Sequence, residues 1–193
     1  MKTAIIGGGA AAFFAAINTK ENFPNSEVVI FEKTNKLLSK VLISGGGRCN
    51  LTNSETSIST FSKHYPRGEK QLKKIFGTFN NQDTKNWFES RGVELVAEHD
   101  GRMFPKSNTS QTIYDLFLHE SEKLGIKIKL KSGVNSIKQE AEKIILEVNG
   151  KFLLFDKVIV CTGGSPKLEG FNWIKNLGHK IENPVPSLFT FNI

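Results

Sequence analysis

The hydrophobic pattern of the N-terminal region changes its period twice. A short apolar run over residues 3–6 predicts a strand, and three consecutive glycines follow it. Apolar residues then recur at i, i+3, i+4 and i+7, which predicts a helix over about residues 9–19. That apolar face consists of Ala10, Phe13, Phe14 and Ile17. A second apolar run, residues 28–31, is typical of a parallel strand covered on both faces. Residues 3–32 are therefore predicted to form one strand–helix–strand unit.

The middle of the chain is less regular. Helical spacing recurs near residues 69–76 and 83–90, and Gly92 is a suitable stop for the second helix. A strand over residues 93–97 is expected to follow. The consecutive glycines at 45–47 require a loop with unusual backbone dihedral angles or a close approach of the backbone.

A longer helix is predicted after this region, with Thr109 or Ser110 as its N-cap and Gly125 as its C-terminal stop. Its apolar stripe contains Ile113, Leu116, Phe117 and Leu124. Residues 126–130 then predict a strand. If this strand lies in the same sheet as residues 28–31, the long stretch between them is one crossover connection that carries an insertion.

The pattern changes again after residue 133. Three strands are predicted, over residues 134–138, 143–148 and 151–155, and Asn149-Gly150 between the last two is a strong hairpin signal. Another apolar run, residues 158–161, ends in Thr-Gly-Gly. We predict an α/β fold in which a Rossmann-like parallel sheet carries an antiparallel β-meander.

Composition limits the class of protein. A chain of 193 residues with 38% hydrophobic and 23% charged residues has the composition of an ordinary globular protein. No apolar run is long enough to span a bilayer, and the glycines at 7–9 interrupt the apolar N-terminus, so we expect no targeting segment and a cytoplasmic location. The two cysteines are then expected to be reduced thiols.

The net charge is +7, and basic residues gather at 63–74 and 123–131. In the second stretch lysines alternate with Ile126, Ile128 and Leu130, as on the solvated side of a strand. This alternation favours a solvated face over a nucleic-acid surface. Because histidines and cysteines are scattered, we expect no metal site.

The first glycine motif, residues 7–12, satisfies G-x-G-x-x-A between a predicted strand and a predicted helix. Gly7 would permit the tight turn, Gly9 would let a pyrophosphate approach the backbone, and Ala12 would allow close packing of helix and strand. The first turn of the helix, from Ala10, would offer free N–H groups to the phosphates. The alternative is a plain tight turn in an unrelated α/β protein.

Glu32 ends the second predicted strand, 20 residues beyond Ala12. An acidic residue in this position accepts hydrogen bonds from a ribose hydroxyl and disfavours a 2′-phosphate, so the primary nucleotide should not be NADP. A charged strand end in solvent is the alternative.

The remaining layout resembles the large flavoproteins with two dinucleotide-binding motifs, in which Thr162-Gly163-Gly164 matches the second motif, which touches FAD. Residues 43–53, Ile-Ser-Gly-Gly-Gly-Arg-Cys-Asn-Leu-Thr-Asn, resemble the BaiN-like, or aminoacetone-oxidase-like, family of NAD(P)/FAD-dependent oxidoreductases. Residues 101–105, 162–165 and 178–181, and then 186–188, fit the same family.

This resemblance implies FAD as the cofactor, NAD(P)H as the reductant and a small-molecule substrate. The expected cofactor-binding residues are Gly7, Gly9, Ala10, Glu32, Lys33, Lys40, Arg48, Cys49, Asn50, Val134, Thr162 and Gly163. Val134 would meet the adenine through its backbone. Residues 166–173 depart from the family's glycine-rich pattern, so no contact is assigned there, and the sequence assigns no catalytic residue.

Two residues of the glycine loop have alternative roles. Arg48 is expected to offer its fork of donors to the cofactor, with a surface arginine as the alternative. For Cys49 we favour a small packed residue over a thiol activated by the neighbouring arginine.

Arg102 would either meet an anion or the flavin, or form a structural salt bridge.

The resemblance also implies a domain division. Residues 1–183 would form the FAD-binding domain, and residues 184–193 a proline-containing linker and the first strand of an inserted domain. Because an exposed terminal strand invites aggregation, we expect the chain to be truncated there. The alternatives to a flavin-dependent oxidoreductase are a flavoprotein that acts on RNA and a non-catalytic dinucleotide-binding module. Substrate, direction of electron transfer and oligomeric state stay open.

Overall fold

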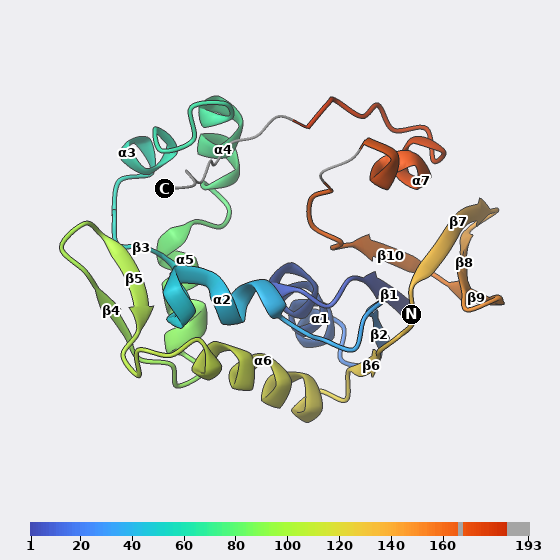
Figure 1. Cartoon of the computed structure of the whole chain (residues 1–193), viewed down its shortest axis with the longest axis horizontal. Helices are drawn as coiled ribbons and strands as arrows, with labels where there is room; N and C mark the ends of the chain where they lie inside the picture. The colour runs from blue at the N-terminus through green and yellow to red at the C-terminus, as the bar shows by residue number, and fades with distance from the viewer. Residues whose placement is uncertain (166–167, 185–193) are drawn as a thin grey trace, which may run out of the picture. The chain divides into compact units, whose positions relative to one another are not determined.

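A computed structural model describes residues 1–165 and 168–184 of the chain (Figure 1). These residues form two compact units. One contains residues 1–37 together with the chain from residue 121 onward, and we call it the sheet unit. The other contains residues 38–120, and we call it the insert unit. Apart from Pro184, the predicted linker and strand over 184–193 lie outside the described residues, so the domain division stays a prediction.

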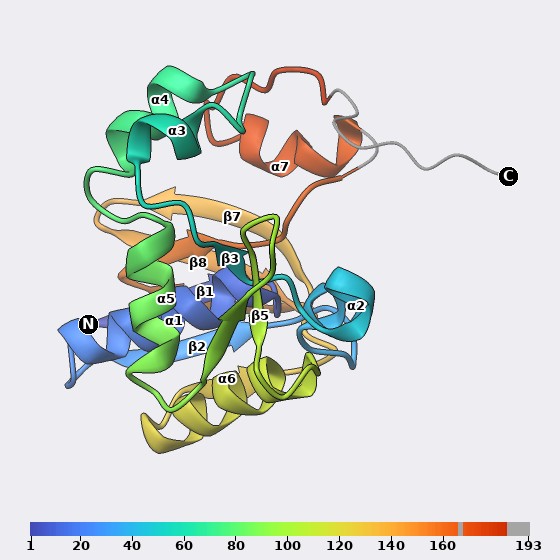
Figure 2. The same ribbon diagram turned by 90° about the vertical axis from the view of Figure 1, so that its left-hand side faces the viewer.

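The sheet unit contains the predicted parallel sheet. Its strands are β1 (Lys2–Ile6), β2 (Glu27–Phe31), β6 (Lys127–Lys129) and β10 (Lys157–Val160), in the order β10-β1-β2-β6. All three neighbouring pairs are parallel, and β1 and β2 run side by side (Figure 2). The strand–helix–strand prediction for residues 3–32 is therefore confirmed.

Helix α1 (Ala10–Asn22) joins β1 to β2. Its buried face consists of Ala12, Phe13, Ala16 and Ile17. The predicted face is partly wrong, because Ala10 is exposed and Phe14 is only half-buried. Small alanines rather than large side chains fill half of the buried face, which brings the helix close to the strands.

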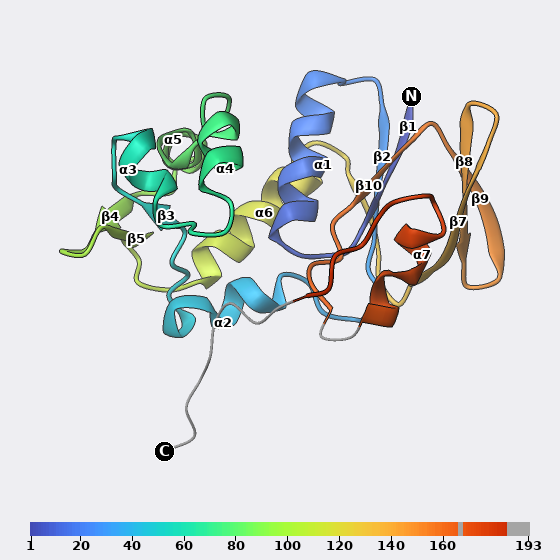
Figure 3. The same cartoon turned by 90° about the horizontal axis from the view of Figure 1, so that it is seen from above.

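The predicted meander forms a second, antiparallel sheet of β7 (Val134–Glu140), β8 (Lys143–Val148) and β9 (Lys151–Phe155). Asn149 and Gly150 form the predicted hairpin turn, with φ of 50° and 73°. The meander covers one face of the parallel sheet, and α1 lies on the other (Figure 3). Buried side chains join the two sheets, and the rings of Phe31 and Phe155 meet edge to face with centroids 5.8 Å apart.

The connection between β2 and β6 is the predicted crossover with an insertion. β6 pairs parallel to β2, with Val29 opposite Lys127, and the chain between them contains the whole insert unit. Helix α6 (Gln111–Lys123) precedes β6, and Gly125 ends the connection with a φ of 66°, as expected for a C-terminal stop. Thr109 accepts a hydrogen bond of 3.3 Å at Oγ1 from the N–H of Gln111.

The insert unit has a small antiparallel sheet in the order β3-β5-β4. Its elements are α2 (Ser39–Gly47), β3 (Thr52–Asn53), α3 (Ile58–Ser62), α4 (Glu69–Ile75), α5 (Asn81–Glu89), β4 (Leu95–Ala97) and β5 (Arg102–Pro105). The predicted helices α4 and α5 and the strand β4 are present. α5 begins earlier than predicted because Asn80 and Asp83 form a capping box.

After β10 the described chain forms a short 3₁₀ helix, η1 (Leu168–Phe171), and a single turn, α7 (Asn172–Lys175). None of the helices in the described part of the chain combines the length and apolar character needed to cross a membrane.

Candidate functional site

A pocket of about 330 Å³ lies at the carboxyl ends of β1, β2 and β10 in the sheet unit. This is the edge at which open parallel α/β sheets bind ligands. Six of the predicted cofactor-binding residues line it, namely Gly7, Glu32, Lys33, Val134, Thr162 and Gly163. Residues that lie far apart in the sequence are thus brought together in one pocket.

Gly7 is fixed by backbone geometry. Its φ is 112°, and a Cβ atom added to it would lie 2.4 Å from the carbonyl oxygen of Cys161. The N–H of Gly7 donates to the carbonyl oxygen of Phe31 over 2.8 Å, and the N–H of Cys161 donates to that of Ile6 over 2.8 Å. The turn therefore holds β1, β2 and β10 together, and only glycine fits it.

Gly9 and Ala10 do not line this pocket but begin α1 beside it. Gly9 is the N-cap and supplies no side-chain hydrogen bond to the first turn. A Cβ added to Gly9 would find no heavy atom within 4 Å, and Ala10 is exposed. The helix N-terminus is therefore open, with first-turn N–H groups and the positive end of the helix dipole directed outward.

The Glu32 carboxylate is held against the glycine turn. Its Oε2 accepts a 2.7 Å hydrogen bond from the N–H of Gly8, and its Oε1 accepts one of 2.7 Å from the N–H of Thr34. A Cβ on Gly8 would lie 2.8 Å from Leu37 Cδ2 and 3.0 Å from the Cβ of Glu32. A side chain at position 8 would therefore displace Leu37, and this close contact was not predicted, because the motif leaves that position free.

Backbone hydrogen bonds bring Val134 to the same edge. The N–H groups of Lys131 and Ser132 donate to the carbonyl oxygens of Thr34 and Glu32, each over 2.8 Å. Gly133 then passes so close to Lys33 that an added Cβ would lie 3.2 Å from the Lys33 Cβ. The meander therefore enters the pocket at Val134, while the side chain of Lys33 stays exposed.

The Thr-Gly-Gly segment forms the opposite wall. Thr162 and Gly163 are exposed, and Gly163 has a φ of 72°. Cys161, just before them, is half-buried, and this burial raises the pKa of its thiol. A neutral thiol at this position has the character of a packing residue.

Several lining residues were missed by sequence reasoning, including Gly133, Ser136, Phe171 and Trp173. The Nε1–H of Trp173 donates to the carbonyl oxygen of Gly170 over 3.0 Å, which closes the η1–α7 turn. A glycine just before a predicted strand was an available signal for Gly133. No sequence signal pointed to Phe171 and Trp173, because their segment departs from the family pattern.

The other four predicted residues, Lys40, Arg48, Cys49 and Asn50, lie in the insert unit. There α2 is interrupted, with non-helical dihedral angles from Ser44 to Gly46. The glycines at 45, 46 and 47 have φ of 57°, 68° and 84°, which confirms the predicted unusual loop. A Cβ on Gly45 would lie 2.7 Å from the backbone nitrogen of Asn50, so the loop closes tightly on itself.

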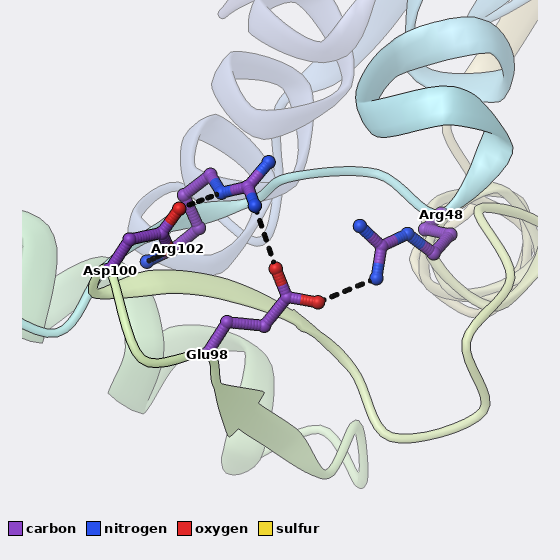
Figure 4. Close-up of polar contacts among 4 residues, drawn as sticks. All are labelled: Arg48, Glu98, Asp100 and Arg102. Atoms are coloured by element: carbon purple, nitrogen blue, oxygen red, sulfur yellow. Dashed lines mark hydrogen bonds and ion pairs between the residues drawn. The ribbon is translucent and has the colours of Figure 1, made fainter.

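The side chain of Arg48 extends from this loop toward a cluster of ion pairs (Figure 4). Its Nη1 lies 2.7 Å from Glu98 Oε1, and its guanidinium lies 4.0 Å from the ring centroid of Phe104. Arg102 contacts the other oxygen of Glu98 over 2.9 Å and Asp100 over 2.6 Å. A hydrogen bond from the backbone N–H of Arg102 lowers the pKa of Asp100. Of the two roles open for Arg102, the structural salt bridge is the one present.

Cys49 is buried, at 5% exposure, and burial raises the pKa of its thiol despite a hydrogen bond with Ser44, which acts in the opposite direction. Burial and the raised pKa favour the packed residue over a thiol activated by the neighbouring arginine. Asn50 is exposed and lines a second pocket within the insert unit, and Lys40 is exposed.

The architecture is shared with solved flavoproteins. A flavocytochrome c3 fumarate reductase superposes with a TM-score of 0.62 at 20% sequence identity, covering 84% of this chain and 33% of that protein. The parallel sheet with its antiparallel meander defines the fold class as Rossmann-type α/β. Within this class the chain belongs to the HI0933-like protein Rossmann domain family, whose model matches residues 1–185.

Curated relatives have two different substrates. The chain is 27% identical to the 3-dehydro-bile acid delta(4,6)-reductase of Clostridium scindens, over 98% of this chain and 47% of that protein. It is 30% identical to the ribosomal RNA dihydrouridine synthase of Haemophilus influenzae, over 83% of this chain and 39% of that protein. The chain thus spans less than half the length of these relatives.

Proposed function

We propose that the chain carries the FAD-binding part of a flavin-dependent oxidoreductase. The observation that carries this proposal is the contact between the Glu32 carboxylate and the N–H of Gly8, which joins an acidic group to a glycine turn at the pocket edge. In the proposed complex, Gly7, Gly9 and Ala10 face the pyrophosphate, and Glu32 accepts hydrogen bonds from the ribose.

The residues present fit this cofactor. The α1 N-terminus lacks a side-chain cap, and the open space around Gly9 leaves room for a phosphate group. Val134, Thr162 and Gly163 line the pocket. In the proposed complex Val134 would meet the adenine through its backbone, and Thr162 and Gly163 would close over the cofactor. Bound flavin would supply the hydride or electron chemistry, while the protein positions it and excludes competing reactions.

The four residues of the insert unit stay predictions carried by the family resemblance. Lys40, Arg48, Cys49 and Asn50 are assigned to the cofactor loop on that ground alone. The engagement of Arg48 by Glu98 means that a cofactor contact would share or replace this ion pair.

NAD(P)H is proposed as the reductant and a small molecule as the substrate. The finer BaiN-like assignment rests on residues 43–53 and on the similarity to the bile acid reductase. Anaerobic addition of NADH or NADPH to the purified flavoprotein should bleach the visible flavin band. Bound FAD without any bleaching would support a non-catalytic dinucleotide-binding module instead.

Replacement of Glu32 tests the cofactor site. Glu32→Ala removes charge-assisted hydrogen bonds worth about 1.5–3 kcal/mol, so FAD affinity should fall roughly 10- to 150-fold. Glu32→Gln keeps one acceptor oxygen and should lie between this variant and the wild type. Affinity is measured by titration of apoprotein with FAD, following quenching of flavin fluorescence.

The matched control is Glu142→Ala, which removes the same charge at an exposed position before β8. This variant should bind FAD as the wild type does. If Glu32→Ala also binds FAD with unchanged affinity, Glu32 does not contact the ribose.

A second candidate is a flavoprotein that reduces a base in RNA. The similarity to the ribosomal RNA dihydrouridine synthase favours it over the other alternative, a non-catalytic dinucleotide-binding module. Both candidates require bound FAD and differ in the electron acceptor. Reoxidation of the reduced flavin by RNA, but not by small enones, would select this second candidate.

A further inference from the structure

The α3–α4 segment of the insert unit carries a dense positive charge. Residues 63–74 contain five cations and a single acid, Glu69. The cations are Lys63, Arg67, Lys70, Lys73 and Lys74, and all five are exposed. Within the described residues none of them forms an ion pair with a carboxylate, although Lys73 donates to Ser59 Oγ over 3.1 Å.

The three lysines of α4 share one side of the helix. Lys70, Lys73 and Lys74 stand at i, i+3 and i+4, so their side chains are neighbours on the helix surface. Like charges in this arrangement repel one another and destabilise an isolated helix. The cluster gives this side of α4 a local positive charge that a polyanion would compensate.

The second basic stretch of the chain behaves differently. On β6 the side chain of Lys127 pairs with Glu27 over 3.0 Å, and Lys129 is exposed beside the half-buried Ile128. This confirms the solvated strand face that its alternation predicts. Among the described residues the contrast lies at Lys127, because no cation of the α3–α4 segment has such a carboxylate partner.

Beside these cations lies an aromatic pocket of about 550 Å³ within the insert unit. Phe61, Tyr65 and Phe76 form one ring cluster in its wall, with centroids 4.9 Å apart for Phe61–Phe76 and 5.7 Å apart for Tyr65–Phe76. Tyr65 is 41% exposed. Amide side chains such as those of Asn50 and Asn53 also line the pocket.

We propose that this surface, formed by the five cations of residues 63–74 and the aromatic pocket, binds single-stranded nucleic acid. The cations would contact successive phosphates, and Tyr65 would stack on a base whose edge faces the amides. Proteins bind single strands by this combination of a positive surface with aromatic stacking platforms. An acidic protein or an anionic membrane would need the charge but not the amide-lined aromatic pocket.

The proposal goes beyond the proposed function, and of the residues assigned to the cofactor it includes only Asn50, which none of the variants below changes. The probe is a fluorescein-labelled 12-mer of oligouridylate, and binding to the purified protein is followed by fluorescence anisotropy at several salt concentrations. Removing three charges with Lys63→Gln, Lys70→Gln and Lys74→Gln should lower the slope of log affinity against log salt by about 2, at roughly 0.7 per phosphate contact.

Tyr65→Ala should weaken binding about ten-fold with little change in the salt slope, because stacking rather than charge is lost. Tyr65→Phe keeps the ring and should restore the affinity. Circular dichroism of both variants shows whether the fold is retained. If it is, weak binding by Tyr65→Ala together with normal binding by Tyr65→Phe assigns the loss to stacking.

The matched charge control is a single variant that combines Lys129→Gln, Lys138→Gln and Lys151→Gln. These three lysines are exposed and belong to the sheet unit. An equal loss in this control would show a response to net charge alone and would overturn the proposal. So would wild-type binding that is as tight to a 12-base-pair duplex or to anionic phosphatidylserine vesicles. A DNA 12-mer of the matching sequence distinguishes RNA from DNA as the source of the single strand.

Because FAD affinity is measured separately, the two proposals fail independently. The variant with Lys63→Gln, Lys70→Gln and Lys74→Gln should bind FAD as the wild type does. Loss of FAD binding by Glu32→Ala with intact oligouridylate binding would leave the nucleic-acid surface in place.

Discussion

The two units fix their predicted cofactor residues by different means. In the sheet unit, the backbone does so: Gly7 packs against the carbonyl of Cys161, and Gly8 donates to Glu32. In the insert unit, side chains do so as well: Arg48 is held by Glu98 and by the ring of Phe104. A backbone contact as close as that of Gly7 tolerates no added atom, whereas a site held by side chains loses its contacts one at a time.

The largest effect is therefore expected at Gly7. Gly7→Ala imposes a strained backbone and a clash with Cys161, which together should lower the free energy of unfolding by roughly 3 kcal/mol or more. Urea denaturation followed by circular dichroism measures the change. A variant as stable as the wild type would show that the turn has room to adapt.

Gly9→Ala is the matched control within the same turn. Position 9 has an ordinary φ of −94° and open space around it, so the fold should be retained. FAD affinity should nevertheless fall, because the added methyl group occupies the space proposed for the pyrophosphate.

A smaller effect is expected in the insert unit at Arg48. Arg48→Ala removes the ion pair and the stacking on Phe104, a loss of about 1–2 kcal/mol for partly exposed groups. Glu98→Gln leaves the stacking intact and should lower the free energy of unfolding by less than about 1 kcal/mol. The same denaturation experiment compares the two variants. Because Glu98→Gln also removes the ion pair of Glu98 with Arg102, a larger loss in Arg48→Ala would show that stacking on Phe104 contributes more than this second pair. A loss in Glu98→Gln as large as that in Arg48→Ala would contradict the expected order.

The smallest effect concerns chemical reactivity without a change of fold. Because burial raises the pKa of Cys49, its thiolate forms only at higher pH than that of an ordinary thiol. In a Cys161→Ser variant, alkylation of Cys49 by iodoacetamide should be slow near neutral pH and accelerate toward alkaline pH, as measured by mass spectrometry. Fast alkylation at neutral pH would instead indicate an activated thiol.

Much of the fold could be predicted because its signals are local. The apolar runs of β1 and β2, the Asn149-Gly150 turn and Gly125 each act within a few residues. The short elements β3, β5 and α3 could not be predicted in this way, because two to five residues carry no measurable period.

The residues of the candidate site also divide into those recognised from local sequence spacing and those that depend on contacts between distant parts of the chain. The glycine motif and Glu32 are recognisable from their spacing, whereas Val134 and Thr162 were assigned through the family resemblance. The partner of Arg48 lies 50 residues away, at Glu98, and no sequence pattern links the two. Trp173 contributes to the pocket only through the tertiary fold.

The pairing of β1 with β10 has a consequence for how the protein is made. Val160 pairs with Ile6 across almost the whole chain, so one edge of β1 has no partner until β10 has been synthesised. At about 5–20 residues per second, this takes roughly 8 to 30 s on the ribosome. During that time β1 presents an edge of unpaired backbone N–H and C=O groups, which is a template for pairing with a strand of another chain.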